Sequence, residues 1–273
     1  MASPVQITVR QLSRLIGTPS APVLLDVRID DDIAEDPTGL PAAILCSHEL
    51  LAELAPSLSD QRVVVYCQKG LKLSEGVAAL LRCAGVHAEV LEGGHFRWRD
   101  AELPLVPHDR VPVHTERGHS LWVTRIRPKI DRIACPWLIR RFVDPQAQFM
   151  FVTASAVEAV AGKFNATPFD VEDVFWSHRG EFCTFDTMLD EFCLTSDPLS
   201  RLATIVRAAD TNRHDLAPEA AGLLAASLGL SRMYSDDLEQ LDAGMLLYDA
   251  LYRWCRDATD EGHDDWPMTP PRT

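Results

Sequence analysis

Residues 63–74 read VVVYCQKGLKLS, and this stretch decides the fold of the first part of the chain. The β-branched run Val63–Tyr66 predicts a short buried strand. The apolar spacing of Ser74–Cys83, with Gly85 just past its end, predicts a helix after a short loop. Similar patterns predict strands at Val23–Val27 and Glu89–Leu91 and a helix at Ser47–Leu54. Alternating strands and helices predict an α/β domain, a parallel sheet with helices on both faces.

Cys67 directly follows the predicted strand, at the sheet edge where parallel sheets form their sites. A loop between a strand end and a helix N-terminus directs backbone N–H groups at whatever the cysteine carries. These donors, together with the cations Lys69 and Lys72, favour a thiolate with a lowered pKa. Gly70 lets the loop curl without a Cβ clash. The loop is therefore predicted to hold an activated sulfur nucleophile in a cradle suited to a persulfide anion.

Three motifs in the first 108 residues resemble the rhodanese domain. They are Asp26-Val27-Arg28, Cys67-x-x-Gly70-x-Lys72-x-Ser74, and Leu91-Glu92-Gly93-Gly94 with Trp98 and Leu103-Pro104. The resemblance covers about residues 5–108 and implies a sulfurtransferase that requires no cofactor. In such an enzyme the catalytic Cys67 takes a sulfane sulfur from a small-molecule donor such as thiosulfate. The resulting persulfide then passes its sulfur to a thiol or cyanide acceptor.

The same resemblance implies which residues contact the substrate. The substrate-binding residues are Gln68, Lys69, Gly70, Leu71 and Lys72, with Asp26 and Arg28 buttressing the site. Many rhodaneses that act on thiosulfate have arginine where this chain has Lys72, and lysine lacks the planar fork that grips an oxyanion at two points. The physiological donor is therefore left open. The alternative is an inactive scaffold in which Cys67 is only a small buried residue.

Length, charge and cysteine usage limit the remaining possibilities. A chain of 273 residues predicts two domains, here 1–108 and 121–273 joined by a proline-rich linker at 109–120. The net charge of −14 disfavours nucleic-acid binding. Seven cysteines without a Cys-x-x-Cys pair are typical of a reducing compartment. With no readable signal peptide and no apolar run of ~18 residues, we expect a cytoplasmic protein without a membrane partner.

The second domain is predicted to be mainly α with a small β element. Strands are expected at Leu121–Arg125 and Phe149–Val152. Because Pro136 suits only a first helical turn, a helix is expected to start near Cys135. Further helical patterns cover residues 155–164, 184–193, 198–211, 218–228 and 236–257.

Four strings in this region resemble the C-terminal domain of the chromate resistance protein B family, over about Trp122–Trp254. They are WVTRIRPKIDRIACPWLIRRFVDP, PFD, SHRGEFCTFDTML and RLATIVRAADT. The resemblance implies an association with chromate resistance, as a regulator or an accessory factor. Regulators of this family carry a different N-terminal region, which disfavours a transcriptional role. The main hypothesis is therefore a chromate-resistance-associated sulfurtransferase, and the alternative is a metal- or oxyanion-sensing accessory protein.

Four residues of the second domain are candidate metal ligands: His178, Glu181, Asp210 and His214. Within each pair the spacing is three or four residues, which places both side chains on one helix face. Imidazole with carboxylate suits Zn, Fe or Mn. The alternative is that Asp210 caps a helix or pairs with a neighbouring arginine.

A basic segment offers a second candidate site, for chromate or another oxyanion. Its residues are Lys129, Arg132, Arg140 and Cys135, close to the predicted helix start at Pro136. At that position the pKa of Cys135 is expected to be lowered. The alternative is that the arginines at 140 and 141 pair with the abundant acids of this anionic chain.

Overall fold

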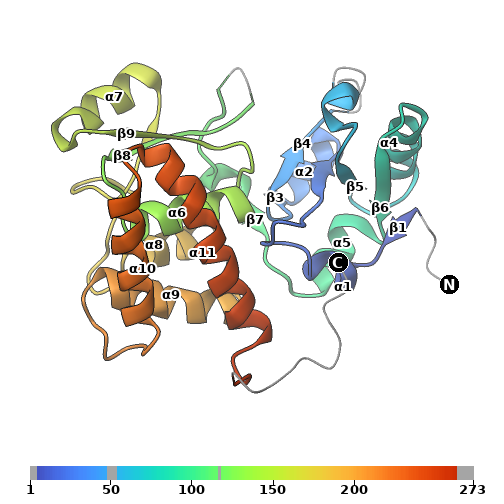
Figure 1. The fold of residues 1–273 in the computed structure, drawn as a ribbon. Helices are drawn as coiled ribbons and strands as arrows, with labels where there is room; N and C mark the ends of the chain where they lie inside the picture. Colours follow the sequence, from blue (N-terminus) through green and yellow to red (C-terminus); the bar gives the residue numbers. More distant parts are fainter. Residues whose placement is uncertain (1–4, 48–53, 116–117, 263–273) are drawn as a thin grey trace.

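A five-stranded parallel sheet forms the N-terminal region of the computed structural model, which describes residues 5–47, 54–115 and 118–262 (Figure 1). The strand order is β1-β6-β5-β2-β4. The strands are β1 (Gln6–Ile7), β2 (Val23–Asp26), β4 (Ala43–Leu45), β5 (Arg62–Tyr66) and β6 (His87–Leu91). The predicted parallel sheet is thus confirmed, with β5 between β2 and β6.

Helices cover both faces of this sheet because successive residues of β5 point to opposite sides. Val63 and Val65 pack in one apolar cluster with α4, whereas Val64 lies in another with α1 and α5. The helices are α1 (Val9–Ser13), α2 (Asp30–Glu35), α4 (Lys72–Cys83) and α5 (Gly94–Asp100), with a 3-10 turn η2 (Ala55–Leu58). A short antiparallel pair, β3 (Thr38–Gly39) and β7 (Val106–Pro107), lies beside the sheet. Most of the helix predicted at Ser47–Leu54 falls outside the described residues.

The C-terminal region is mainly helical around a small parallel sheet, as predicted. Its sheet has the order β10-β8-β9, made of β8 (Leu121–Arg125), β9 (Gln148–Val152) and β10 (Thr167–Pro168). The helices are α6 (Asp131–Phe142), α7 (Val157–Phe164), α8 (Thr184–Glu191), α9 (Asp197–Asp210), α10 (Ala220–Met233) and α11 (Asp237–Asp257). In Figure 1, α11 crosses in front of α6.

Helix α6 begins at Asp131, four residues before the predicted start, and contains Pro136 in its second turn. The prediction was wrong because it placed the start of the helix from the position of Pro136 alone. Proline removes one backbone hydrogen bond, but eight further residues of α6 besides Asp131 are buried in the core. Trp137 shows the strength of this packing: its ring contacts four other aromatic rings, and its indole N–H donates to Asp249 at 2.8 Å.

The two regions are packed against each other through one continuous apolar cluster. Leu12 and Trp98 of the first region belong to the same cluster as Trp137 and Phe142 of the second. The backbone N–H of Ala42 also donates to the carbonyl of Phe142 at 2.8 Å. The connection between them includes the 3-10 turn η3 (His108–Arg110), and the backbone N–H of Thr115 donates to the carbonyl of His119 at 2.8 Å. The regions therefore form one contiguous body and not two tethered units.

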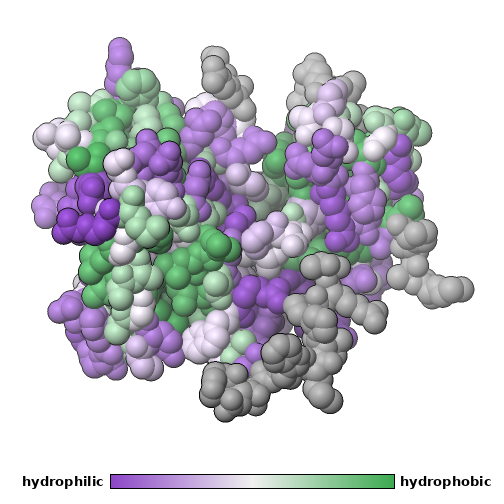
Figure 2. Space-filling view, viewed as in Figure 1, coloured by the Kyte–Doolittle hydropathy of each residue, from purple (hydrophilic) through white to green (hydrophobic). Residues whose placement is uncertain are grey.

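Exposed apolar side chains gather on the outer surface of α10 and α11, as Figure 2 shows. They include Leu228, Met233, Leu238 and Leu246. No helix within the described residues combines the length and the apolar character that crossing a membrane requires.

Candidate functional site

Cys67 lies at the carboxyl end of β5, in the loop that leads into α4. Its Sγ is 3.3 Å from the hydroxyl oxygen of Ser74, and the residue is 7% exposed. Burial, the largest single effect, would raise the pKa of the thiol. Hydrogen bonds from the Ser74 hydroxyl and from the backbone N–H groups of Ser74, Leu71 and Lys69 outweigh burial, so the pKa is lowered. The loop therefore favours a thiolate, in the direction predicted from the sequence.

The N–H groups converge on the sulfur because the loop carbonyls are engaged elsewhere. The first turn of α5 binds them: His95 N–H donates to the Cys67 carbonyl and Phe96 N–H to the Gln68 carbonyl, each at 3.0 Å. Gly70 has φ +67°, and a Cβ there would stand 2.5 Å from the Leu91 carbonyl oxygen. Only glycine fits this position, because the loop lies directly against the turn that precedes α5.

A buried ion pair supports the same strand ends from behind. The Arg28 guanidinium donates to the Asp26 carboxylate from Nε at 3.0 Å and from Nη2 at 2.6 Å. Its other donors reach the carbonyls of Asp36 and Thr38, and the Tyr66 hydroxyl donates to Asp26 at 2.9 Å. Both members of the pair are buried. Asp26 and Arg28 are thus buried beneath the strand ends that carry the loop.

The outer rim of the loop carries the exposed members of the predicted substrate-binding set. Lys69, Leu71 and Lys72 are exposed, and Gln68 donates to Glu35 at 2.9 Å. The hydrogen bonds that lower the Cys67 pKa come from backbone N–H groups and a hydroxyl, whereas the sequence argument had relied partly on the lysine charges. The two lysines instead place positive charge on the exposed rim of the loop.

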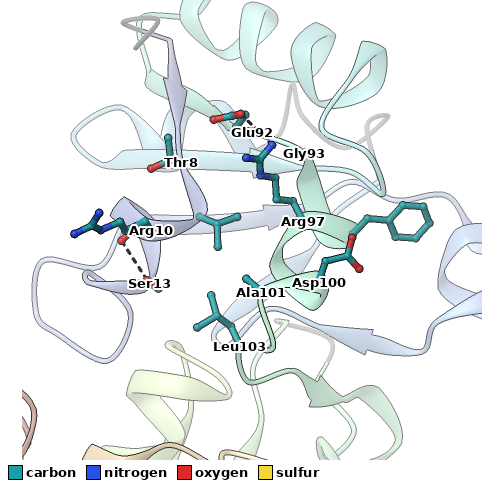
Figure 3. Close-up of a pocket in the computed structure, with 11 residues that line it drawn as sticks. Thr8, Arg10, Ser13, Glu92, Gly93, Arg97, Asp100, Ala101 and Leu103 are labelled. Atoms are coloured by element: carbon teal, nitrogen blue, oxygen red, sulfur yellow. Dashed lines mark hydrogen bonds and ion pairs between the residues drawn. The ribbon is translucent and has the colours of Figure 1, made fainter. Parts of the chain in front are cut away.

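A cavity of about 810 Å³ lies between α1 and α5, and none of residues 67–72 lines it. Figure 3 shows Arg97 extended toward Glu92 on one side of it, with Arg10 and Ser13 on the other. Arg97 Nη1 and Glu92 Oε1 are 3.3 Å apart. Gly93 also lines this cavity. The cavity therefore lies behind the turn that supports the cysteine loop and is separate from the sulfur site.

Four side chains of the C-terminal region meet in what we call the acid–histidine cluster: Asp131, Asp170, His178 and Asp210. They come from the start of α6, the turn after β10, the loop before α8 and the end of α9. His178 Nε2 is 3.2 Å from Asp210 Oδ2, 3.5 Å from Asp170 Oδ1 and 3.7 Å from Asp131 Oδ2. Three carboxylates thus surround one imidazole.

Asp131 is the buried end of this cluster. Its Oδ2 accepts the backbone N–H of Thr184 at 2.6 Å and that of Phe185 at 3.3 Å, both at the N-terminus of α8. Burial raises the pKa of this carboxyl well above its usual range, and the charges of Asp210 and Asp170 raise it further. Oδ1 is buried without a hydrogen-bond partner of ordinary geometry among the described residues. One oxygen is therefore firmly anchored while the other is unsatisfied.

The solvent side of the cluster is occupied by His178, whose side chain is 41% exposed. Hydrogen bonds to Asp170 and Asp210 raise its pKa to about 10. Asp170 is held by the Thr184 hydroxyl at 2.8 Å from Oδ1 and by Arg132 Nε at 3.2 Å from Oδ2. The cluster is therefore rich in acidic groups, and a proton on His178 or a cation would offset part of its negative charge.

Comparison with known proteins assigns both regions. A family model described as a rhodanese-like domain matches residues 8–101, and one described as the C-terminal domain of ChrB matches residues 122–255. The chain joins a rhodanese-like domain to a ChrB C-terminal domain. The Cys67 loop lies in the first of these and the acid–histidine cluster in the second.

Individual proteins and solved structures are similar to parts of the chain. A protein named Protein ChrB from Cupriavidus metallidurans is 27% identical over 215 residues, 74% of this chain and 65% of that protein. The match thus spans slightly less than two thirds of the relative. A rhodanese-related protein structure from Thermoplasma volcanium is 24% identical, with a TM-score of 0.32, over 37% of this chain and 96% of that one. A rhodanese-like domain protein from Staphylococcus aureus is 27% identical, with a TM-score of 0.30, over 34% of this chain and 89% of that one.

The structure brings together only part of the predicted metal set in the ChrB C-terminal domain. His178 Nε2 and Asp210 Oδ2 are 3.2 Å apart, whereas Glu181 and His214 are exposed. Among the described residues, the group whose ligand atoms all lie within 4.8 Å of one another is Asp131, Asp170 and His178. The helical spacing that paired His178 with Glu181 and Asp210 with His214 does not apply. His178 and Glu181 lie in a loop, and α9 ends at Asp210, before His214.

The predicted oxyanion pocket is not assembled. Arg132 pairs with Asp170, Arg140 with Asp242 and Arg141 with Asp249, as the alternative interpretation expected. Cys135 is fully buried, and burial together with nearby aspartates raises its pKa well above the usual range. The prediction of a lowered pKa was wrong because Cys135 lies inside α6 and not at its N-terminus.

Sequence reasoning missed Asp131 and Asp170 as members of the cluster. A signal was present for each. Asp131 is the acid within the otherwise apolar and basic string KIDRIACPWLI, and Asp170 closes the string PFD after a short strand. An acid at either place is costly to bury without a partner, which marks both as candidates for a site.

Proposed function

We propose that the chain is a sulfurtransferase in which Cys67 carries a persulfide. The observation that carries this proposal is the convergence of three backbone N–H groups and the Ser74 hydroxyl on the Cys67 sulfur. Such a cradle stabilises an anionic sulfur without requiring a metal or an organic cofactor. It suits both the thiolate that starts the reaction and the persulfide anion that follows it.

In the first step the Cys67 thiolate attacks the outer sulfur of a donor such as thiosulfate. A Cys67–sulfur bond forms, the sulfur–sulfur bond of thiosulfate breaks, and sulfite leaves with the electron pair. Lys69 and Lys72, exposed on the rim, attract the anionic donor. The loop N–H groups then stabilise the negative charge on the terminal sulfur of the persulfide.

In the second step a thiolate or cyanide attacks that terminal sulfur. The new sulfur–acceptor bond forms as the persulfide bond breaks, and the electron pair returns to Cys67 as thiolate. The lowered pKa of Cys67 makes it a good leaving group in this step. The pair Asp26 and Arg28 maintains the strand ends that hold the loop, without taking part in bond making.

Replacing Cys67 by serine tests this proposal. We expect Cys67→Ser to lose thiosulfate:cyanide sulfurtransferase activity and to fail to gain a sulfur atom, by mass spectrometry, after incubation with thiosulfate. The matched control is Cys83→Ser, because Cys83 is an exposed thiol at the end of the same helix α4. Undiminished activity in Cys67→Ser, or loss of activity in both variants, would contradict the proposal.

We further propose that this activity is associated with chromate resistance, as the resemblance of residues 122–254 to the ChrB C-terminal domain supports. The alternative function is sensing of a metal or an oxyanion by that domain. The acid–histidine cluster favours a cation over chromate, because its groups are carboxylates around one imidazole. Calorimetric titration of the full chain should detect no chromate binding at this domain. Chromate binding without cation binding would reverse this preference.

A further inference from the structure

We propose that the acid–histidine cluster of the ChrB C-terminal domain binds one divalent first-row metal ion. The ligands are Asp131, Asp170 and His178, with Asp210 completing the set directly or through a water molecule. The proposal is independent of sulfur transfer at Cys67.

The distances fit a single ion. Ligand atoms at ~2.1 Å from an octahedral ion stand about 3.0 Å apart when adjacent and about 4.2 Å apart when opposite. One atom each from Asp131, Asp170 and His178 can be chosen so that all lie within 4.8 Å of one another. Asp210 Oδ2 lies 3.2 Å from His178 Nε2. The ligand atoms of Asp131, Asp170 and His178 are therefore close enough to approach one ion, and Asp210 lies beside His178.

An unsatisfied buried oxygen gives independent support. Asp131 is fully buried, and its Oδ1 has no hydrogen-bond partner of ordinary geometry among the described residues. The Cys183 thiol interacts with this carboxyl only as a weak donor. A buried carboxylate oxygen without a partner is costly, and coordination to a cation would remove that cost.

The surrounding groups hold the ligands in position. The N–H groups of Thr184 and Phe185 fix Asp131, and the Thr184 hydroxyl with Arg132 fixes Asp170. Such outer contacts orient ligating carboxylates in metal sites. The partly exposed His178 lies on the solvent side, which leaves room for water or a small ligand on the ion.

The types of ligand in the cluster indicate which metal ion to use in the experiment. Three carboxylates and one imidazole are richer in oxygen than typical zinc sites, and this mixture suits Mn²⁺ or Fe²⁺. Mn²⁺ is the more convenient probe because the free aqueous ion has a strong electron paramagnetic resonance signal that decreases on binding.

The experiment titrates the full-length, chelator-treated protein with Mn²⁺ alone and follows the free-ion signal. We expect one Mn²⁺ per chain in the wild type. His178→Ala and Asp170→Asn should each weaken binding by about tenfold or more, as loss of a ligand or its close support does in metal sites. Because His178 is partly exposed, His178→Ala should keep the fold, which circular dichroism and thermal unfolding verify.

Matched controls come from the same domain. Glu181→Gln and His214→Ala alter exposed residues outside the cluster and should leave Mn²⁺ affinity unchanged within about twofold. Cys67→Ser should also bind Mn²⁺ like the wild type, which separates this site from the sulfurtransferase proposal. Absence of saturable binding of Mn²⁺, Fe²⁺ and Zn²⁺ by the wild type would overturn the inference. So would binding of wild-type affinity in both His178→Ala and Asp170→Asn, because the ion would then be held outside the cluster.

Discussion

The Cys67 loop and the acid–histidine cluster are built by opposite means. The loop takes its chemistry from consecutive residues 67–74, and most of its donors are backbone N–H groups. The cluster takes its chemistry from side chains of four segments that span residues 131–210. The first presents hydrogen-bond donors and suits an anion, whereas the second presents acceptors and suits a cation. A site of backbone donors depends on loop shape, and a site of side chains depends on packing between distant elements.

The largest expected effect tests the dependence of the first site on loop shape. Gly70→Ala places a Cβ at φ +67° and 2.5 Å from the Leu91 carbonyl oxygen. We expect a loss of about 2–4 kcal/mol in the free energy of unfolding. Because the donors around Cys67 would move, sulfurtransferase activity should fall on the order of a hundredfold or more. Urea denaturation and a thiosulfate:cyanide assay measure the two effects.

The control for this variant is Gly76→Ala in the helix that follows the loop. Gly76 lies inside α4, and a Cβ there would meet no atom within 4 Å. This substitution should stabilise the protein by roughly 0.5–1 kcal/mol and leave activity intact. Mn²⁺ binding should be unchanged in both glycine variants as long as the chain is folded. Equal activity in the two variants would show that the loop does not need its close approach to the turn before α5.

A smaller effect is expected when the support behind the loop is weakened. Arg28→Lys keeps the charge but loses the fork that binds Asp26 and the carbonyls of Asp36 and Thr38. We expect the free energy of unfolding to fall by about 2–4 kcal/mol, with activity reduced and Mn²⁺ affinity retained below the unfolding transition. Arg213→Lys, which alters an exposed pair with Asp215, should leave the urea midpoint unchanged. An unchanged midpoint in Arg28→Lys would remove the buttressing role.

The smallest expected effect tests how the hydrogen-bond donors of the loop set the Cys67 pKa. Ser74→Ala removes one of the donors that lower the Cys67 pKa. The rate of persulfide formation rises with pH as the thiolate forms, so the rising limb should shift to higher pH and the rate near neutral pH should fall modestly. A pH profile identical to that of the wild type would mean that the backbone N–H groups alone set the pKa.

Local sequence predicted the rhodanese-like domain in considerable detail. The strand at 63–66, the loop that begins at Cys67 and the helix that ends at Cys83 are all confirmed. The parallel sheet followed from the alternation of strand and helix patterns. This was possible because buried parallel strands, a glycine at positive φ and a helix start each impose their residue types over a few neighbouring positions.

Prediction was weaker in the ChrB C-terminal domain, where elements were found but their contacts were not. Pro136 gave the wrong start for α6, because the burial of that helix outweighs one lost backbone hydrogen bond. Helical spacing paired His178 with Glu181 and Asp210 with His214, although neither pair shares a helix. The basic segment read as an anion pocket, yet its arginines pair with acids from other elements.

The sequence by itself determined the two domain types, the position of Cys67 at a strand end and the glycine that its loop requires. Only the tertiary structure decided that Asp131 and Asp170 join His178 and Asp210, since that meeting depends on how α6, α8 and α9 pack against one another and on where the turn after β10 lies. The physical reason is the separation along the chain between the residues that determine each site. Backbone conformation and hydrogen bonding in a loop are set by adjacent residues, whereas the neighbours of a buried carboxylate are set by close packing among elements that are distant along the chain.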